Sequence, residues 1–444
     1  MPHRPTVAPS RSTAAPLYRK LRPRPNGPAR EEVASNQRGR LHGAMVEAIT
    51  ARGYEQTSVA ELCRLAGISK RTFYEQFENK EACYLASYER LSHRAIARLQ
   101  ETLEGLPSDG DVTPALTALL ADVVARPKET RLVMSSMPRG PALLRRRERR
   151  RNELRQAVIA ALTHESSGVR FPLVLVNGIG FGVERALSRA LLMDHAHTPG
   201  LPEGLARWLS SLCSPAYARL EHALDRPLRE DRQLSPSLRG RNRTASRRAR
   251  VLRATAEITA TEGYGRLTIS KIAARAQLPE ESLVPVHEGT EAYLLEALDL
   301  VNLEAIMAAV EAGESARNGV AGACLGIRTL LELVARDHVL RRLIFAEASH
   351  AGPTATHRAE RIAYGLLEAL RARLPHDVSE PTWAGVEATA GALWGVIQDH
   401  VTRGNSQTLP ALSSQISFLV LAPMVGGEAA CDALGEVLSA TSAY

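Results

Sequence analysis

Aromatic residues are scarce in this sequence. Phe, Trp and Tyr make up 4% of the 444 residues, whereas hydrophobic residues of all kinds make up 44%. The core must therefore be filled mainly by Leu, Ala and Val, as in helix bundles. Gly and Pro gather in a few places instead of punctuating the chain at short, regular intervals, which argues against an all-β sandwich. We expect an all-α fold, and the length indicates two or three domains.

Cysteine and long apolar runs are scarce as well. The five cysteines are odd in number and widely scattered, and no Cys-x-x-Cys pair occurs, so we expect neither a disulfide framework nor a zinc site. No charged-then-apolar leader opens the chain, and no apolar run approaches the length that a bilayer crossing requires. These absences predict a cytoplasmic protein with no membrane partner.

Motifs of catalysis are missing too. The G-x-S-x-G, H-E-x-x-H and P-loop spacings do not occur. Gly178, Gly180 and Gly182 form a G-x-G-x-G run, but no βαβ pattern surrounds it, so close helix packing explains it better than nucleotide binding. An Asp and two His near residue 195 resemble a metal site, but they precede a Thr-Pro-Gly turn and are better explained as loop residues. We expect no catalytic residue, no cofactor and no metal, and hence no enzyme.

Positive charge is concentrated in two arms. The net charge of the chain is +8, yet residues 1–40 and residues 226–250 each carry a net +7, and residues 251–444 carry −9. Basic segments of this kind commonly contact phosphates, because each neutralised phosphate releases condensed counterions. The alternative is that the arms are solvated tethers, and the sequence leaves both interpretations open.

Two short helices joined by a tight turn are predicted between residues 58 and 80. Ser58 and Glu61 form a capping box at the start of the first helix. One apolar stripe runs along that helix, formed by Val59, Leu62 and Leu65. Gly67 then ends it, because glycine accepts the left-handed backbone that helix ends favour.

The second short helix begins after Ser69, which is placed to cap it. Phe73 and Phe77, four residues apart, share its inner face. The side chains left to point outward or to flank this helix are Lys70, Arg71, Thr72, Tyr74 and Gln76. Planar donor groups of this kind suit the DNA major groove, where they read base edges. For an isolated motif, a surface hairpin with a solvated face is the alternative.

The surrounding sequence makes the motif more specific. Upstream, an apolar helical stripe ends at Gly53-Tyr54, and downstream Asn79 is placed to cap a further helix. The order of elements, with T-S-V-A-x-L, A-G-I-S and T-F-Y, closely resembles the DNA-binding domain of TetR/AcrR-type transcriptional regulators over about residues 38–85. The resemblance implies a DNA-binding transcription regulator, in most cases a repressor that a small-molecule effector releases from its operator. Nothing in the sequence identifies the effector, and an apolar or amphipathic compound is the default expectation.

The resemblance also implies roles for individual residues. Arg71 would be the leading base reader in the major groove of a double-stranded operator. The residues divided between bases and phosphates would be Lys70, Thr72, Tyr74 and Gln76, and Ser69, which caps this helix, would also belong to the DNA-binding surface. Ser58 and Lys80 would hold the DNA backbone near helix N-termini. Arg38 and Arg40 would lie just before the first helix and thread a basic arm along a groove.

The pattern of the first half recurs after the second basic arm. Gly263-Tyr264 follows Gly53-Tyr54 by 210 residues, and at the same shift Ile272 falls on Leu62. We infer an internal duplication, in which one TetR-like unit is fused to another. Because relatives pair through their last two helices, the resemblance implies an intramolecular pseudo-dimer of the two repeats. A homodimer of two chains is the alternative.

The second copy keeps the core pattern and loses the residues expected to read DNA. Glu280 and Glu281 stand where the first copy has Lys70 and Arg71. Pro285 falls in the middle of the expected helix, where proline costs about 3 kcal/mol. We therefore expect a folded second head that does not bind DNA as the first does.

These patterns predict a tandem organisation. Its segments are a disordered basic arm (1–36), a helix-turn-helix head (37–84), a helical regulatory domain (85–225), a basic linker (226–247), a degenerate helix-turn-helix head (248–296) and a second helical regulatory domain (297–444). The rival prediction is a helical ligand-sensing or scaffold protein that binds no specific operator. The basic first head and the basic arms argue against it.

Overall fold

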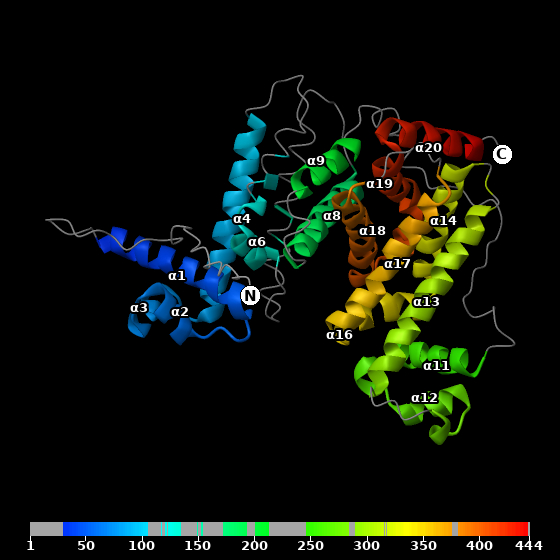
Figure 1. Cartoon of the computed structure of the whole chain (residues 1–444), viewed down its shortest axis with the longest axis horizontal. Helices are drawn as coiled ribbons and strands as arrows, with labels where there is room; N and C mark the ends of the chain where they lie inside the picture. Colours follow the sequence, from blue (N-terminus) through cyan, green and yellow to red (C-terminus); the bar gives the residue numbers. More distant parts are fainter. Residues whose placement is uncertain are drawn as a thin grey trace, which may run out of the picture. The chain divides into compact units, whose positions relative to one another are not determined.

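The computed structural model describes most of the chain. The described residues are 30–104, 120–121, 123–134, 152–153, 172–192, 200–212, 246–283, 289–314, 318–374 and 381–442, together with the single positions 117, 149 and 316. Every regular element within them is helical, which confirms the predicted all-α class (Figure 1). The chain divides into two compact units. The first comprises Met1–Arg98 and Ala125–Leu154, and the second comprises Leu99–Val124 and Arg155–Tyr444.

The first unit is a small helical head. Its helices are α1 (Arg30–Arg52), α2 (Val59–Ala66), α3 (Lys70–Gln76), α4 (Lys80–Glu104), which continues past the unit boundary, and α6 (Pro127–Met134). The core lies where α1, α2, α3 and α4 meet. Its fully buried side chains include Leu41, Met45, Leu62, Phe73 and Tyr84.

Helix α1 begins earlier than the sequence predicts. The arm was expected to extend to residue 36, but the helix starts at Arg30. Glu31 and Glu32 occupy its first turn, where carboxylates interact favourably with the positive end of the helix dipole. The predicted arm over residues 1–29 lies outside the described residues.

The predicted helix ends of the head are largely confirmed. The Ser58 hydroxyl accepts a hydrogen bond from the Glu61 amide at 3.2 Å, and Asn79 Oδ1 accepts one from the Ala82 amide at 2.8 Å. Gly67 adopts the left-handed conformation, with φ of 60°. The predicted apolar stripe is wrong at Leu65, which is 41% exposed. The face of α2 that packs on the core is instead formed by Leu62, Cys63 and Ala66.

The second unit contains the remaining helices. They are α8 (Leu173–Leu192), α9 (Leu201–Leu212), α11 (Arg247–Glu262), α12 (Ile269–Ala276), α13 (Gly289–Glu314), α14 (Gly319–Arg336), α15 (His338–Arg342), α16 (Ala348–His350), α17 (Pro353–Arg371), α18 (Trp383–Thr402), α19 (Ser413–Val425) and α20 (Gly427–Ser442). Short helical turns connect several of them, namely η3 (Tyr264–Arg266), η4 (Glu280–Ser282), the π-helical η5 (Leu343–Glu347) and η6 (Ser406–Leu412).

Helices α8 and α18 cross at very short range because glycines line the crossing. A Cβ atom on Gly182 would meet the Ala388 carbonyl oxygen, and one on Gly391 would meet the Cβ of Arg185. Gly178 lies under the side chain of Leu419 on α19. Close helix packing, the explanation preferred for the G-x-G-x-G run, is therefore confirmed at Gly178 and Gly182.

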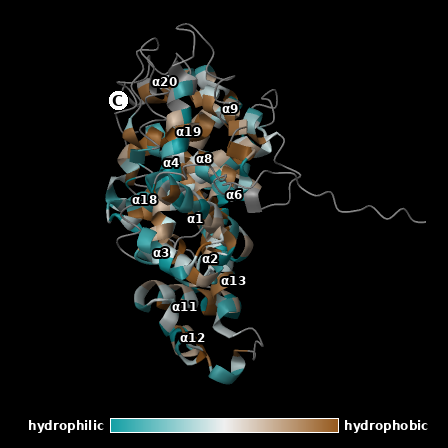
Figure 2. Cartoon of the chain, turned by 90° about the vertical axis from the view of Figure 1, so that its left-hand side faces the viewer, coloured by the Kyte–Doolittle hydropathy of each residue, from teal (hydrophilic) through white to brown (hydrophobic). Residues whose placement is uncertain are grey.

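One stretch of the second unit corrects the expectation that no apolar run is long enough to cross a bilayer. Ser406–Val425 has the length and composition of a membrane span, although 67% of its most apolar window is buried inside the structure. It consists of η6 and α19, and Figure 2 colours most of α19 as hydrophobic. Helices α8, α9, α14, α18 and α20 all contact α19. A helix that is apolar on all sides is expected where neighbours surround it, and the burial of α19 fits that explanation.

The close crossing makes Gly391 intolerant of a side chain. We predict that Gly391→Leu lowers the free energy of unfolding by about 1–3 kcal/mol, because the new side chain has to push α8 away from α18. Gly265→Leu is the matched control, since a Cβ there meets no atom within 4 Å. Urea unfolding followed by circular dichroism measures both variants. Equal midpoints for the two would contradict the prediction.

Candidate nucleic-acid interface

Helix α3 is held in place by its cap and by one aromatic side chain. The Ser69 hydroxyl accepts a hydrogen bond from the Thr72 amide at 3.0 Å and lies 2.9 Å from the Thr72 hydroxyl. Phe73 is fully buried, and Phe77, directly after the helix, packs beside it with ring centroids 6.1 Å apart. The apolar side of α3 is thereby fixed to the core, which leaves the opposite side free to display polar groups.

The outward face of α3 carries two cations and a tyrosine. Lys70 and Arg71 are exposed, and Tyr74 is 57% exposed with its ring edge-on to Phe73. The Arg71 side chain is 90% exposed and lies 3.1 Å from Glu75 Oε1. Exposed pairs of this kind contribute little to stability, so Arg71 can leave Glu75 for a base or a phosphate at small cost.

The structure places the two arginines of the predicted arm inside α1 instead of before it. Arg38 Nε donates a hydrogen bond to Gln76 Oε1 at 2.8 Å, which joins it to the last residue of α3. Arg40 Nη2 donates to the carbonyl oxygens of Ala66 and, at 2.7 Å, Gly67. Arg40 thus satisfies carbonyl groups left unpaired at the end of α2. The expectation that these arginines precede the first helix is wrong, because α1 starts eight residues before Arg38.

Lys80 contacts the loop between α1 and α2, which ends at Ser58. Lys80 Nζ donates to the carbonyl oxygens of Tyr54 at 3.0 Å and Thr57 at 2.9 Å, and it lies 4.1 Å from the centre of the Tyr54 ring. An ammonium group has three protons, so one donor remains for a phosphate. Lys80 therefore positions the loop that leads to Ser58, and no local pattern in the sequence indicates this contact.

A buried histidine lies behind α3. His42 on α1 is 8% exposed, its Nδ1 lies 2.8 Å from the Ser87 hydroxyl on α4, and its ring meets Phe77 edge-on. Burial, with Arg90 and Arg38 adding a smaller effect, lowers the pKa of His42 to about 4. A neutral His42 is therefore part of the support of α3. Sequence analysis missed it, although its place beside the buried Leu41 on an apolar helix face was a usable signal.

The head of the second unit differs from the first head at the positions that correspond to α3, residues 280–286, of which the structure describes 280–283. Thr268 caps α12 as Ser58 caps α2. After α12, residues 280–282 form the short turn η4, in which Glu280 and Glu281 are exposed, and the predicted helix-breaking Pro285 lies outside the described residues. Pro279 stands where Ser69 caps α3, and it makes no side-chain capping bond. This head therefore displays carboxylates at the position where the first head displays Lys70 and Arg71.

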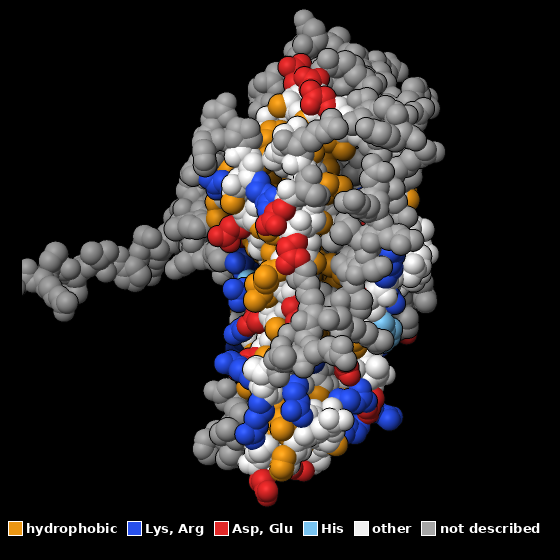
Figure 3. All heavy atoms as spheres, turned by 90° about the vertical axis from the view of Figure 1, so that its right-hand side faces the viewer, with side chains coloured by type: hydrophobic (Ala, Val, Ile, Leu, Met, Phe, Trp, Pro, Cys, Tyr) orange, Lys and Arg blue, Asp and Glu red, His pale blue; other side chains and the backbone are white. Residues whose placement is uncertain are grey.

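Four arginines of α11 already have hydrogen-bond acceptors within the second unit. Their acceptors are the Ser282 carbonyl for Arg247 (2.8 Å), Glu296 for Arg248 (2.9 Å), the Ala276 and Gln277 carbonyls for Arg250 (2.5 and 3.0 Å) and Glu304 for Arg253 (2.5 Å). On the face drawn in Figure 3, Lys and Arg side chains gather toward the bottom of the view, where Figure 1 places α11 and α12. Their presence there is thus not by itself a sign of DNA binding.

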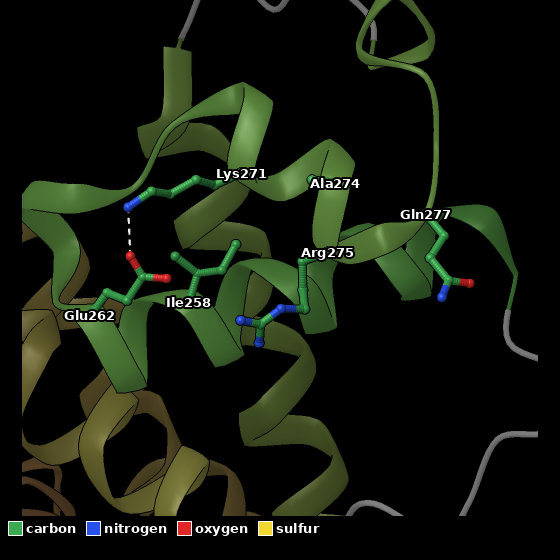
Figure 4. Close-up of a pocket in the computed structure, with 6 residues that line it drawn as sticks. All are labelled: Ile258, Glu262, Lys271, Ala274, Arg275 and Gln277. Carbon is green, nitrogen blue, oxygen red and sulfur yellow. Dashed lines mark hydrogen bonds and ion pairs between the residues drawn. The ribbon is translucent and has the colours of Figure 1, made fainter.

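A shallow groove of about 440 Å³ lies between α11 and α12 (Figure 4). It is lined by Ile258, Glu262, Lys271, Ala274, Arg275 and Gln277. Lys271 pairs with Glu262 at 2.5 Å, and Arg275 pairs with Glu257 at 3.2 Å. Its charges are therefore neutralised in pairs, which leaves no cluster of free cations for a phosphate.

Two comparisons with known proteins found a match. Residues 43–87, which run from α1 into α4, match the model of the family described as bacterial regulatory proteins, tetR family. A solved structure of a TetR family transcription regulator from Marinobacter aquaeolei VT8 matches with 20% sequence identity and a TM-score of 0.31. That match covers 40% of this chain and 96% of that chain. No curated protein matches the chain.

The depressed pKa of His42 predicts acid sensitivity of the first unit. The folded-state pKa of about 4 lies below the ordinary value of 6.5, so the stabilising contribution is complete above about pH 6.5 and is lost as the pH falls toward 4. We predict a loss on the order of 3 kcal/mol at most across this range, and a smaller loss in His42→Gln, which cannot be protonated. Urea unfolding at a series of pH values measures it. The loss should persist in His93→Gln, a control at an exposed position of α4, and an identical pH dependence in His42→Gln would contradict the prediction.

Proposed function

Because the match over residues 43–87 makes this chain a member of the tetR family of bacterial regulatory proteins, we propose that it represses transcription by occupying a specific double-stranded operator. DNA binding and regulation of transcription follow from the family, which also consists of regulators and not of enzymes. The observation that carries the proposal is the geometry of α3. Its buried Phe73 fixes the helix, and its free face carries Lys70, Arg71 and Tyr74.

In the proposed complex α3 lies in the major groove. Arg71 reads a base edge, since a planar guanidinium pairs bidentately with guanine. Lys70, Thr72, Tyr74 and Gln76 share the remaining base and phosphate contacts. Arg38 supports this end of the helix through its bond to Gln76. Ser58 and Lys80 contact the DNA backbone, which positions the head but carries no sequence information.

Release from the operator is proposed to follow binding of a small molecule among the helices that come after the head. Such an effector acts only if it binds the DNA-competent and DNA-incompetent states with different affinities. The side chains buried between the helices of the second unit are mainly those of Leu, Ala and Ile. We therefore propose an apolar or amphipathic compound as the class of effector. A regulator of this kind works in the cytoplasm, where its operator lies.

An internal duplication is proposed as the origin of the chain, and three correspondences support it. Helix α2 starts at Val59 and α12 starts at Ile269, which is a shift of 210 residues. Helices α8 and α18 are related by the same shift at both ends. Arg40 and Arg250 are also 210 residues apart, and each donates to the two carbonyl groups that end the next helix.

The two copies are proposed to pair within one chain as a pseudo-dimer. In the second unit α8 and α9, from the first half of the sequence, pack on α18 and α19, from the second half. Trp208 Nε1 on α9 donates a hydrogen bond to the buried Thr389 hydroxyl on α18 at 2.9 Å. Because only the first head carries the proposed reading helix, this arrangement favours one asymmetric half-site. A homodimer of two chains would instead favour a palindrome.

The roles of Arg71 and Lys80 predict two different losses of binding. We predict that Arg71→Ala weakens operator binding by about 1–3 kcal/mol and relaxes base preference at one position, whereas Lys80→Ala weakens binding to every sequence alike. Gel shifts measure both, using an operator selected from random DNA with the wild-type chain and an excess of unselected DNA. Glu281→Ala is the matched control, because Glu281 lies 210 residues after Arg71 and should not contribute. Equal losses on selected and random DNA for Arg71→Ala would reject its reading role.

A further inference from the structure

A cluster of charged side chains is buried where α8 crosses α18. It consists of Arg185 and Arg189 on α8, Glu387 on α18, and Glu360 and Tyr364 on α17, and it is called the crossing cluster below. Arg185 lies 2.7 Å from Glu360, 3.7 Å from Glu387 and 3.2 Å from the Tyr364 hydroxyl. Tyr364 in turn donates to Glu387 at 2.5 Å, and Arg189 Nε lies 3.7 Å from the same carboxylate.

The side chains of the crossing cluster are largely buried, unlike those of an ordinary surface ion pair. The side chain of Glu387 is 7% exposed and those of Glu360 and Arg185 are 14% and 20% exposed. Burial raises the pKa of Tyr364 to about 12 against the opposing effect of Arg185, so its hydroxyl keeps the proton that it donates. Buried ions cost desolvation energy that their attraction repays only when the partners match. Removing or reversing one partner of such a cluster leaves an uncompensated buried ion, which is strongly destabilising.

The charges of the cluster are divided unequally between the two crossing helices. The cations are on α8, and the carboxylates are on α17 and α18. At the shift of 210 residues, Gly395 and Asp399 stand in the places of Arg185 and Arg189, and Asn177 stands in the place of Glu387. A symmetric pairing of α8 with a second α8 would set both arginines against asparagine. A pairing of α18 with a second α18 would set Glu387 against Gly395 and Asp399. The carboxylates of Glu387 and Asp399 would then face each other and repel.

We propose that the crossing cluster determines the pairing of this chain, by matching α8 only to α17 and α18 and by disfavouring two-fold pairing with a second copy. This proposal rests on the pseudo-dimer of the proposed function and adds the residues that specify it. The glycines at the crossing allow two helices to approach closely, but they do not specify which helix is the partner, because glycine has no side chain to match. The buried charges make the choice, since an unmatched buried ion is strongly disfavoured.

Charge reversal in the full-length chain tests the proposal. One variant, Arg185→Glu with Arg189→Glu, makes both sides of the crossing acidic, and another, Glu360→Arg with Glu387→Arg, makes both sides basic. We expect each to lower the thermal midpoint of the second unit by roughly 6–12 °C. All four substitutions together restore matched charges within one chain and should recover most of that loss. The exposed reversal Arg248→Glu at the pair with Glu296 is the control, and its midpoint should stay at the wild-type value.

Mixing the two double variants adds a test of partner choice. The acidic α8 of one chain then matches the basic α17 and α18 of the other, and the reverse pairing matches as well. We expect light scattering of an equimolar, co-refolded mixture to show a species of twice the 48.2 kDa chain mass, which neither variant forms alone. Failure of the fourfold variant to recover stability, or wild-type midpoints in both double variants, would overturn the proposal while leaving the pseudo-dimer intact. A wild-type chain of twice the mass would instead overturn the pseudo-dimer of the proposed function.

Discussion

The burial of Phe73 is the interaction on which the first head depends. Helix α3 has seven residues, which is too short to be stable alone in water. It persists because Ser69 caps it and because Phe73 inserts fully into the core between α1, α2 and α4. The second head differs at both positions. Pro279, which makes no side-chain capping bond, stands in place of Ser69, and the smaller buried Leu283 stands in place of Phe73. Residues 280–282, at the start of this segment, form a three-residue turn. The two heads thus differ in the side chain that caps this segment and in the side chain that anchors it to the core, as well as in the charges that they display.

Arginine serves different purposes in places that look alike in the sequence. Arg71 is almost entirely exposed and free to meet DNA, whereas Arg40 and Arg250 close helix ends by donating to backbone carbonyl groups. Arg185 and Arg189 are mostly buried between helices that come from the two halves of the chain. Net charge therefore indicates where DNA binding is plausible, but only the partners of each guanidinium separate a reading residue from a structural one.

Local features of the head could be predicted because they depend on neighbours in the sequence. The caps at Ser58, Ser69 and Asn79 and the left-handed Gly67 each involve residues within a few positions of one another. The contacts that could not be predicted join distant segments. Arg40 meets the end of α2 and Lys80 meets the loop after α1, each across 23 or more residues.

The same limit applied to burial and to the crossing helices. The period of α2 suggested that Leu65 faces the core, but the core lies on the side of Leu62 and Cys63, a choice made by packing against α1. The G-x-G-x-G run predicted close packing of α8 without naming its partner. Periodicity shows that a helix has an apolar face, but it does not show which helix will cover it.

The central claim is that one chain carries a single reading head, and a footprint of the chain on its selected operator tests it most directly. The account predicts protection of one asymmetric half-site, with guanines contacted in a single stretch of major groove. Protection of two half-sites related by a dyad, about one helical turn apart, would contradict it.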